Sequence, residues 1–267
     1  MAIDVWNENT FDDELRNVLL EHSNLIRKYV ETENRIFREF DNDSGPDRPI
    51  LRPENPYASA FLDLKENLVR YMQSRTIRAW HYTRMTIEEV ETVYSDGIHL
   101  STPESLATRI DRLIQSGCMT KNLAERLISA SPFQSDQRKT REGKFWLVSD
   151  PIPIDDSRVT RLLRYRGGEV GSFHTNDPTL LVPLKNINLG YVLEVVVPLA
   201  TPRHNDLAAC SIVAAHARGL GLTHLSHAFD LYVTKPLDRC SVQRIHTEGR
   251  ECYAEIGRSY PSGFAEY

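Results

Sequence analysis

The sequence predicts an α+β protein, with a helical N-terminal region followed by a domain that mixes helices and strands. Three observations predict this class. Apolar residues recur at helical spacing from Phe11 to Phe40, capped helices recur between residues 58 and 130, and short runs rich in β-branched and aromatic residues follow Gly143. The strands and helices alternate too irregularly for a doubly wound parallel sheet.

The composition is that of a globular protein without a strong overall charge. The chain has 267 residues, of which 40% are hydrophobic and 26% charged, with a net charge of −5. This charge provides no global field for a nucleic-acid backbone or an anionic membrane. Apolar runs fall short of the roughly 20 residues that a membrane span needs. The N-terminus lacks a secretory apolar core and the cysteines form no CxxC pair, so we expect a cytoplasmic protein with reduced thiols.

The N-terminal region is expected to be a layer of helices over residues 1–75. One helix is predicted over residues 11–40, and another over residues 58–74. The segment between them, residues 41–56, is rich in Pro, Asp and Asn and is predicted to be a loop. The second domain is expected to cover residues 76–267.

Within the second domain, the first strand-like run ends in His81-Tyr82-Thr83 and leads into a helix. Thr86 and Glu89 form the capping-box pattern at its start, and Gly97 supplies its stop. The apolar residues of this helix are expected to line one face: Ile87, Val90, Val93 and Tyr94. A short strand is predicted over residues 98–101, and further helices over residues 103–117 and 120–130.

The later part of this domain is expected to be mostly strands. Four runs are typical of strands, namely KFWLVSD, VLEVVVPL, FDLYVT and SVQRIHT. Helical segments are predicted between them, at residues 159–166 and 207–220. His204, His216, His224 and His227 have no Cys or carboxylate partner at ligand-like spacing, so no metal site is expected.

A histidine at the end of a strand, before a capped helix, can face a cleft at the edge of the sheet. Its imidazole can bond a ribose hydroxyl or an amide, and the hydroxyl of Thr83 can both donate and accept. The competing interpretation is that His81 is a satisfied core histidine and Tyr82 a packing aromatic.

The order of segments from residue 78 to residue 248 resembles the ADP-ribosyltransferase superfamily, in particular its His-type branch, which includes diphtheria toxin and the poly(ADP-ribose) polymerases. The residues that carry the resemblance are His81-Tyr82-Thr83, the helix over residues 86–96, the run from Gly97 to Ser101, Phe145 and Trp146 in KFWLVSD, Asp230 in FDLYVT, and the closing SVQRIHT. The resemblance implies a split β-sheet domain that takes NAD as its substrate.

The resemblance also implies roles for these residues. His81 would hold the nicotinamide ribose or the adenosine side, the backbone of Tyr82 would take the carboxamide, and Thr83 would be a further cofactor-binding residue. Gly97, Ser101, Phe145 and Trp146 would line the NAD pocket. Tyr165 is the nearest match to the family tyrosine that stacks on nicotinamide.

Two acids are candidates for the catalytic carboxylate. Asp230 occupies the place of the family glutamate, although it is one methylene shorter. Glu169, in LLRYRGGEVGSF, follows the paired glycines Gly167 and Gly168, which allow close approach of the backbone to a ligand. Arg164 and Arg166, just upstream, could pair with a pyrophosphate.

The expected function is that of an NAD-dependent mono-ADP-ribosyltransferase of bacterial or phage toxin, effector or defence type. Its acceptor would be a protein, a nucleic acid or a small molecule. One alternative is an NAD glycohydrolase, with water as the acceptor. The other is a catalytically silent member of the fold that binds a nucleotide or a partner protein, and the Asp in place of Glu motivates it.

Overall fold

The computed structural model describes residues 2–41, 51–168, 175–185, 187–223, 228–258 and 260. It divides the chain into two compact units. The described residues of Met1–Ile77 and Thr201–Phe229 form a helical unit, and those of Arg78–Ala200 and Asp230–Tyr260 form a sheet unit. The sequence predicts a boundary after residue 75, close to the one observed, but it does not predict that residues 201–229 join the N-terminal helices.

The helical unit is a bundle of α-helices with short helical turns. Its elements are η1 (Glu8–Thr10), α1 (Asp13–Glu21), α2 (Ser23–Ile36), the π-helical turn η2 (Phe37–Asp41), α3 (Ala58–Met72) and α11 (Pro202–Gly219). The single helix predicted over residues 11–40 is broken at His22, whose ψ of 10° departs from helical geometry.

Helix α11 belongs to this unit because it is buried on nearly all sides. Small residues such as Ala208, Ala209 and Ala217 are fully buried, which lets neighbouring helices approach closely. Its buried His216 also binds the N-terminal segment: Nδ1 lies 2.6 Å from Glu8 Oε1, and Nε2 lies 2.9 Å from Ser23 Oγ. The imidazole thus satisfies both of its nitrogens inside the bundle.

The sheet unit is built on one five-stranded antiparallel sheet in the order β4-β2-β1-β3-β5. The strands are β1 (Thr76–Met85), β2 (Phe145–Val148), β3 (Leu189–Pro198), β4 (Asp230–Val233) and β5 (Val242–Thr247). The four late strand-like runs are therefore confirmed as strands, in one sheet where a split sheet is expected. The strand predicted over residues 98–101 is reduced to two isolated bridges, Ile98 to Leu237 and Ser101 to Lys144.

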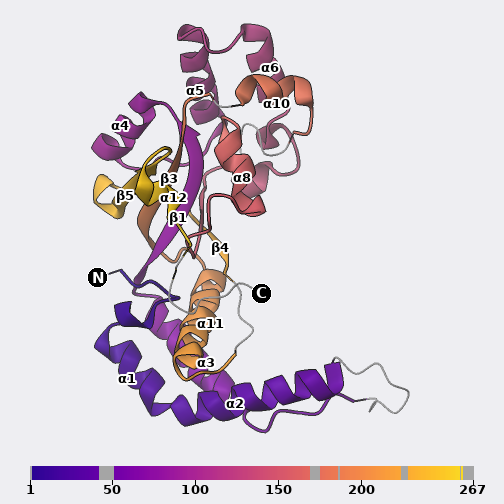
Figure 1. Ribbon diagram of the computed structural model, residues 1–267, viewed down its shortest axis with the longest axis vertical. Coiled ribbons are helices and arrows are strands. Elements are labelled where there is room, and N and C mark those ends of the chain that lie inside the picture. The colour runs from indigo at the N-terminus through magenta and orange to yellow at the C-terminus, as the bar shows by residue number, and fades with distance from the viewer. Residues whose placement is uncertain are drawn as a thin grey trace. The chain divides into compact units, whose positions relative to one another are not determined.

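The helices predicted at residues 86–96, 103–117, 120–130 and 159–166 are present, and the sheet unit also contains short helical segments that the sequence does not predict. The helical elements of this unit are α4 (Ile87–Asp96), α5 (Pro103–Gln115), α6 (Lys121–Ser129), η3 (Pro132–Gln134), α7 (Arg138–Arg141), α8 (Ser157–Arg164), α10 (Pro178–Leu184), η4 (Arg239–Ser241) and α12 (Glu251–Ala254). Helices α5, α6 and α10 gather at one end of this unit, where Ile110, Leu127 and Leu184 share a small core (Figure 1).

A second core lies against one face of the sheet. Trp80 and Tyr82 of β1 pack there with Val159 of α8 and Val192 of β3. The Tyr82 hydroxyl donates to the Ile152 carbonyl at 2.7 Å and accepts from the Ile152 amide at 2.6 Å. The buried tyrosine thus holds the segment that follows β2 against the sheet.

Helix α4 buries a different face from the one that its apolar residues indicate. Its capping box is present as predicted, but Ile87 and Tyr94 are 66% and 55% exposed while Glu89 is buried. The carboxylate of Glu89 turns inward because two arginines bind it there, and Ile87 and Tyr94 are left exposed while Val90 and Val93 are half-buried.

Among the described residues, no helix combines the length and the apolar character needed to cross a membrane.

Candidate functional site

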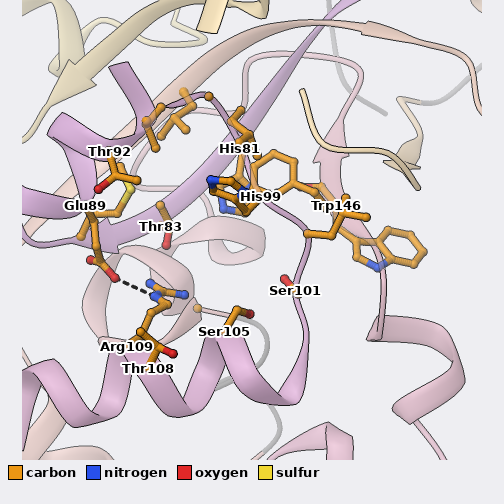
Figure 2. A pocket seen from close by; sticks show the side chains of 18 of the residues that line it. His81, Thr83, Glu89, Thr92, His99, Ser101, Ser105, Thr108, Arg109 and Trp146 are labelled. Carbon is orange, nitrogen blue, oxygen red and sulfur yellow. Dashed lines mark hydrogen bonds and ion pairs between the residues drawn. The ribbon is translucent and has the colours of Figure 1, made fainter. Parts of the chain in front are cut away.

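A pocket of about 470 Å³ opens on the face of β1 opposite the Tyr82 core, within the sheet unit. This volume falls in the range of small-molecule and cofactor sites. The pocket is bounded by the end of β1, by α4 and α5, by the start of β2 and by the Gly167–Gly168 turn (Figure 2). Of the ten predicted site residues, six line it: His81, Thr83, Gly97, Ser101, Phe145 and Trp146.

The alternation of side chains along β1 determines which of the three predicted residues face the pocket. Successive residues of a strand point to opposite faces of the sheet. His81 and Thr83 therefore share the pocket face, whereas the Tyr82 side chain enters the core behind it. Tyr82 is not a pocket-lining residue, and its predicted contact through the backbone stays a prediction.

His81 is held as a neutral hydrogen-bond acceptor. Burial lowers its pKa to about 4, and the nearby positive charge of Arg109 acts in the same direction. Its Nδ1 lies 2.8 Å from the carbonyl oxygen of Trp146. A carbonyl only accepts, so Nδ1 carries the proton and Nε2 is left with its lone pair. This tautomer suits a ligand that brings a hydroxyl or an N–H donor.

The start of β2 supplies an aromatic wall. The Phe145 ring lies 4.3 Å from the His81 ring, centroid to centroid. The Trp146 indole packs against Tyr232, its partner across the β2–β4 pair, and the guanidinium of Arg141 lies 4.9 Å above it. Phe145 therefore offers an apolar ring next to the imidazole, whereas the Trp146 indole is already packed against Tyr232 and Arg141.

Gly97 allows the chain to turn sharply between α4 and the segment that reaches Ser101. Its φ is +88°, and a Cβ at this position would run into the carbonyl oxygen of Leu237. Only glycine accommodates both constraints. Beyond it, the Ser101 amide donates to the Lys144 carbonyl at 3.0 Å, which fixes Ser101 beside the start of β2.

Helices α4 and α5 each contribute one face to the pocket, and the sequence analysis missed both. The lining residues are Glu89, Thr92, Val93 and Asp96 from α4, and Ser105, Thr108, Arg109 and Arg112 from α5. Both sets follow the i, i+3, i+4, i+7 spacing of a single helix face. On α5 this polar face lies beside the apolar stripe that packs on α6. The spacing of polar and apolar residues therefore predicts an amphipathic helix, but it does not indicate that the polar face binds a ligand.

An ion cluster forms part of the pocket wall, with Glu89 and Arg109 in the lining and Arg166 behind them. Glu89 accepts from Arg109 Nε at 2.7 Å, from the Thr86 amide at 2.8 Å and from Arg166 Nη2. Burial alone would raise the pKa of Glu89, but the charges of Arg109 and Arg166 outweigh it and lower that pKa to about 2. Glu89 is therefore ionised at neutral pH, and its oxygens are already occupied.

Arg166 does not face a ligand as the sequence suggests. It is 3% exposed, and it donates to the Arg84 carbonyl at 2.7 Å as well as to Glu89. Burial lowers its pKa to about 10, which still leaves it charged at neutral pH. Its role in the structure is to hold Glu89, while Arg164 is exposed at the end of α8.

Of the two candidate acids, Asp230 is described by the structure and Glu169 is not. Asp230 begins β4 opposite Val148 and is not among the residues that line the pocket. Although it is exposed at the strand end, the protein around it removes water and raises its pKa. Glu169 lies outside the described residues, but Gly167 and Gly168, which precede it, line the pocket.

Tyr165 does not lie where the resemblance implies. It packs against the α5–α6–α10 core and forms a bridge with Lys185, away from the pocket lining. Within the described residues, no three His, Cys, Asp or Glu side chains are grouped to hold a metal ion.

Comparisons with protein-family models, with curated proteins and with solved structures give no significant match to this chain.

Proposed function

We propose that this chain is an NAD-dependent mono-ADP-ribosyltransferase of toxin, effector or defence type, which displaces nicotinamide and transfers ADP-ribose to an acceptor. The observation that carries the proposal is the state of His81, a neutral imidazole beside the Phe145 ring in the pocket, whose Nε2 has no hydrogen-bond partner within the described residues. A ribose hydroxyl is a suitable donor to this nitrogen, and Phe145 offers a ring against which nicotinamide packs. The resemblance of residues 78–248 to the His-type branch supports the same assignment.

In the proposed reaction the bond between the anomeric carbon of the ribose and the nicotinamide nitrogen breaks. Nicotinamide leaves as a neutral molecule with the bonding electron pair. The sugar passes through an oxocarbenium-like state, which a carboxylate near the ribose stabilises. A nucleophilic oxygen, nitrogen or sulfur of the acceptor then bonds to that carbon and loses its proton to the carboxylate or to solvent.

The carboxylate of this proposal is Glu169 or Asp230. The position of Gly168 in the pocket lining supports Glu169, because the two residues are consecutive, whereas Asp230 is absent from that lining. Glu89 is unsuited to the role, because its oxygens already accept from Thr86, Arg109 and Arg166.

The proposal is tested by incubating the full-length protein with NAD labelled in its adenylate phosphate, with and without a cell lysate. Nicotinamide release and label on macromolecules are both measured. His81→Ala is expected to lower nicotinamide release by about 10- to 100-fold, as for loss of a hydrogen bond to a reacting substrate. Glu91→Ala is the control and should leave nicotinamide release unchanged, because Glu91 is exposed on α4 and does not line the pocket.

The outcomes separate the alternatives. Label on a macromolecule supports the transferase, and free ADP-ribose without label transfer points to a glycohydrolase. Thermal stabilisation by NAD without turnover points to a silent binding protein. If NAD neither binds nor reacts, the proposal is wrong.

The catalytic acid is identified by comparing Glu169→Gln with Asp230→Asn in the same assay. The proposal expects turnover to fall by orders of magnitude in one variant while NAD still stabilises the folded protein. Full activity in both variants would remove both acids from the mechanism.

A further inference from the structure

Arg109 is an arginine held in place with most of its donors unused. Its Nε donates to Glu89 at 2.7 Å, and this bond fixes the plane of the guanidinium (Figure 2). Within the described residues, its two terminal nitrogens donate to no protein acceptor. The side chain is 29% exposed and lines the pocket. A guanidinium has five N–H donors, so four of them remain for a ligand.

The charges around Arg109 leave a positive excess on the pocket wall. Glu89 is balanced by Arg166 behind it, so the charge of Arg109 is uncompensated within the cluster. Arg112 lies one turn further along the same face of α5; it forms no salt bridge within the described residues, although its charge acts on the exposed carboxylate of Glu88. The remaining acid on this wall is Asp96, which is exposed at the end of α4. An anion in the pocket would supply the missing counter-charge.

The hydroxyls on this helix face do not compete for the role of donor. Ser105 Oγ donates to the Thr102 carbonyl at 2.9 Å, and Thr108 Oγ1 donates to the Glu104 carbonyl at 2.9 Å. The side-chain donors of this helix face that remain available to an anion are therefore those of the two guanidiniums, Arg109 and Arg112.

We propose that the α5 face carrying Arg109 and Arg112 is a phosphate-binding subsite, in which the fork of Arg109 takes the phosphate oxygens of a nucleotide. This inference rests on the proposed function in one respect: the phosphate is identified as part of the pyrophosphate of NAD. Glu89 acts as a positioning residue, because it holds the fork at the pocket rather than touching the ligand. His81 and Arg109 line the same pocket, which places a ribose-binding group and a phosphate-binding group together, as a nucleotide requires.

The experiment measures the affinity of the full-length protein for ADP, adenosine and inorganic pyrophosphate by titration calorimetry. We expect ADP to bind more tightly than adenosine, and Arg109→Met to reduce that preference by about 10- to 100-fold while adenosine binding is kept. Arg109→Lys preserves a cation beside Glu89 but not the fork of two terminal nitrogens. Its preference for ADP over adenosine is expected to lie between that of the unmodified protein and that of Arg109→Met. Lys121→Met, on the exposed surface of α6, is the matched control and should change nothing.

The results distinguish this inference from the proposed function. If NAD is turned over but the ADP preference is unchanged in Arg109→Lys and Arg109→Met, the subsite is wrong and the proposed function stands. If pyrophosphate binds in an Arg109-dependent manner but NAD is neither bound nor cleaved, the phosphate subsite stands and the proposed function fails. If Arg109→Met does not fold, the comparison of Arg109→Lys with the unmodified protein decides.

Discussion

Glu89→Gln should destabilise the sheet unit by about 3 kcal/mol at neutral pH, and this cost should shrink in acid. The pKa of Glu89 is about 2 in the folded protein against an ordinary value of 4.5. Each unit of such a difference corresponds to about 1.4 kcal/mol of stability. Glutamine keeps the shape of the side chain, and its one oxygen can still accept from the Thr86 amide; the substitution removes the charge and the acceptor that faces Arg109 Nε.

The pH dependence follows from the sign of the shift. Because the folded pKa lies below the unfolded one, the ionised carboxylate stabilises the fold fully above about pH 4.5. That stabilisation is lost as the pH falls towards 2. By pH 3 the unmodified protein should have lost about 2 kcal/mol from this residue, and Glu89→Gln should have lost none of it.

The assay is urea unfolding followed by tryptophan fluorescence, from pH 7 down to pH 3. Trp80 and Trp146 both lie in the sheet unit and report on it. Glu91→Gln, an exposed change on the same helix, is the control and should leave the unfolding curve unchanged. A difference between Glu89→Gln and the unmodified protein that stays constant from pH 7 to pH 3 would refute the reasoning, because packing rather than charge would then explain the loss.

Three further outcomes are expected. Gly97→Ala should lower the free energy of unfolding in urea by more than about 3 kcal/mol, because alanine there meets both a positive φ and a backbone clash. Gly117→Ala is its control and should lower that free energy by about 1 kcal/mol, because Gly117 has a positive φ but lies in open space. Tyr82→Phe should lower the free energy of unfolding by about 2 kcal/mol, because the amide and the carbonyl of Ile152 lose their hydrogen-bond partner. A decrease below about 0.5 kcal/mol would mean that water replaces the hydroxyl. His81 should stay neutral, with its proton on Nδ1, from pH 8 to pH 5. Because its folded pKa lies below the unfolded one, the protein should lose stability as the pH falls from about 6.5 to 4. An NMR titration of the His81 imidazole with a midpoint near 6.5 would contradict this.

The helix boundaries and the pocket face of β1 follow from signals within a few residues. Thr86 and Glu89 cap α4 as their spacing predicts, and Gly97 ends it with a positive φ. The alternation of a strand puts His81 and Thr83 on one face as soon as the strand is recognised. These features are readable because capping, φ preference and strand periodicity are local properties of the chain.

The partners of the charged residues were decided by the tertiary structure. Glu89 accepts hydrogen bonds from Arg109, which is 20 residues away in the sequence, and from Arg166, which is 77 residues away. No local pattern connects these residues, and the apolar periodicity of α4 predicts burial of Ile87 and Tyr94, which are exposed. An ionised carboxylate between two guanidiniums outweighs the burial of Ile87 and Tyr94, so the helix is oriented by charge.

The sequence by itself determined the α+β class, the caps and stops of the helices, the late strands and the strand that carries His81, because each depends on neighbours along the chain, although β1 continues to Met85 rather than ending at Thr83. The tertiary structure alone decided that residues 201–229 pack with the N-terminal helices, that Tyr165 and Asp230 lie away from the pocket lining, and that Arg109 lies in it. These outcomes depend on which surfaces are available for burial once the sheet has formed. A charged residue becomes part of a site only when its partner, distant in sequence, holds it there.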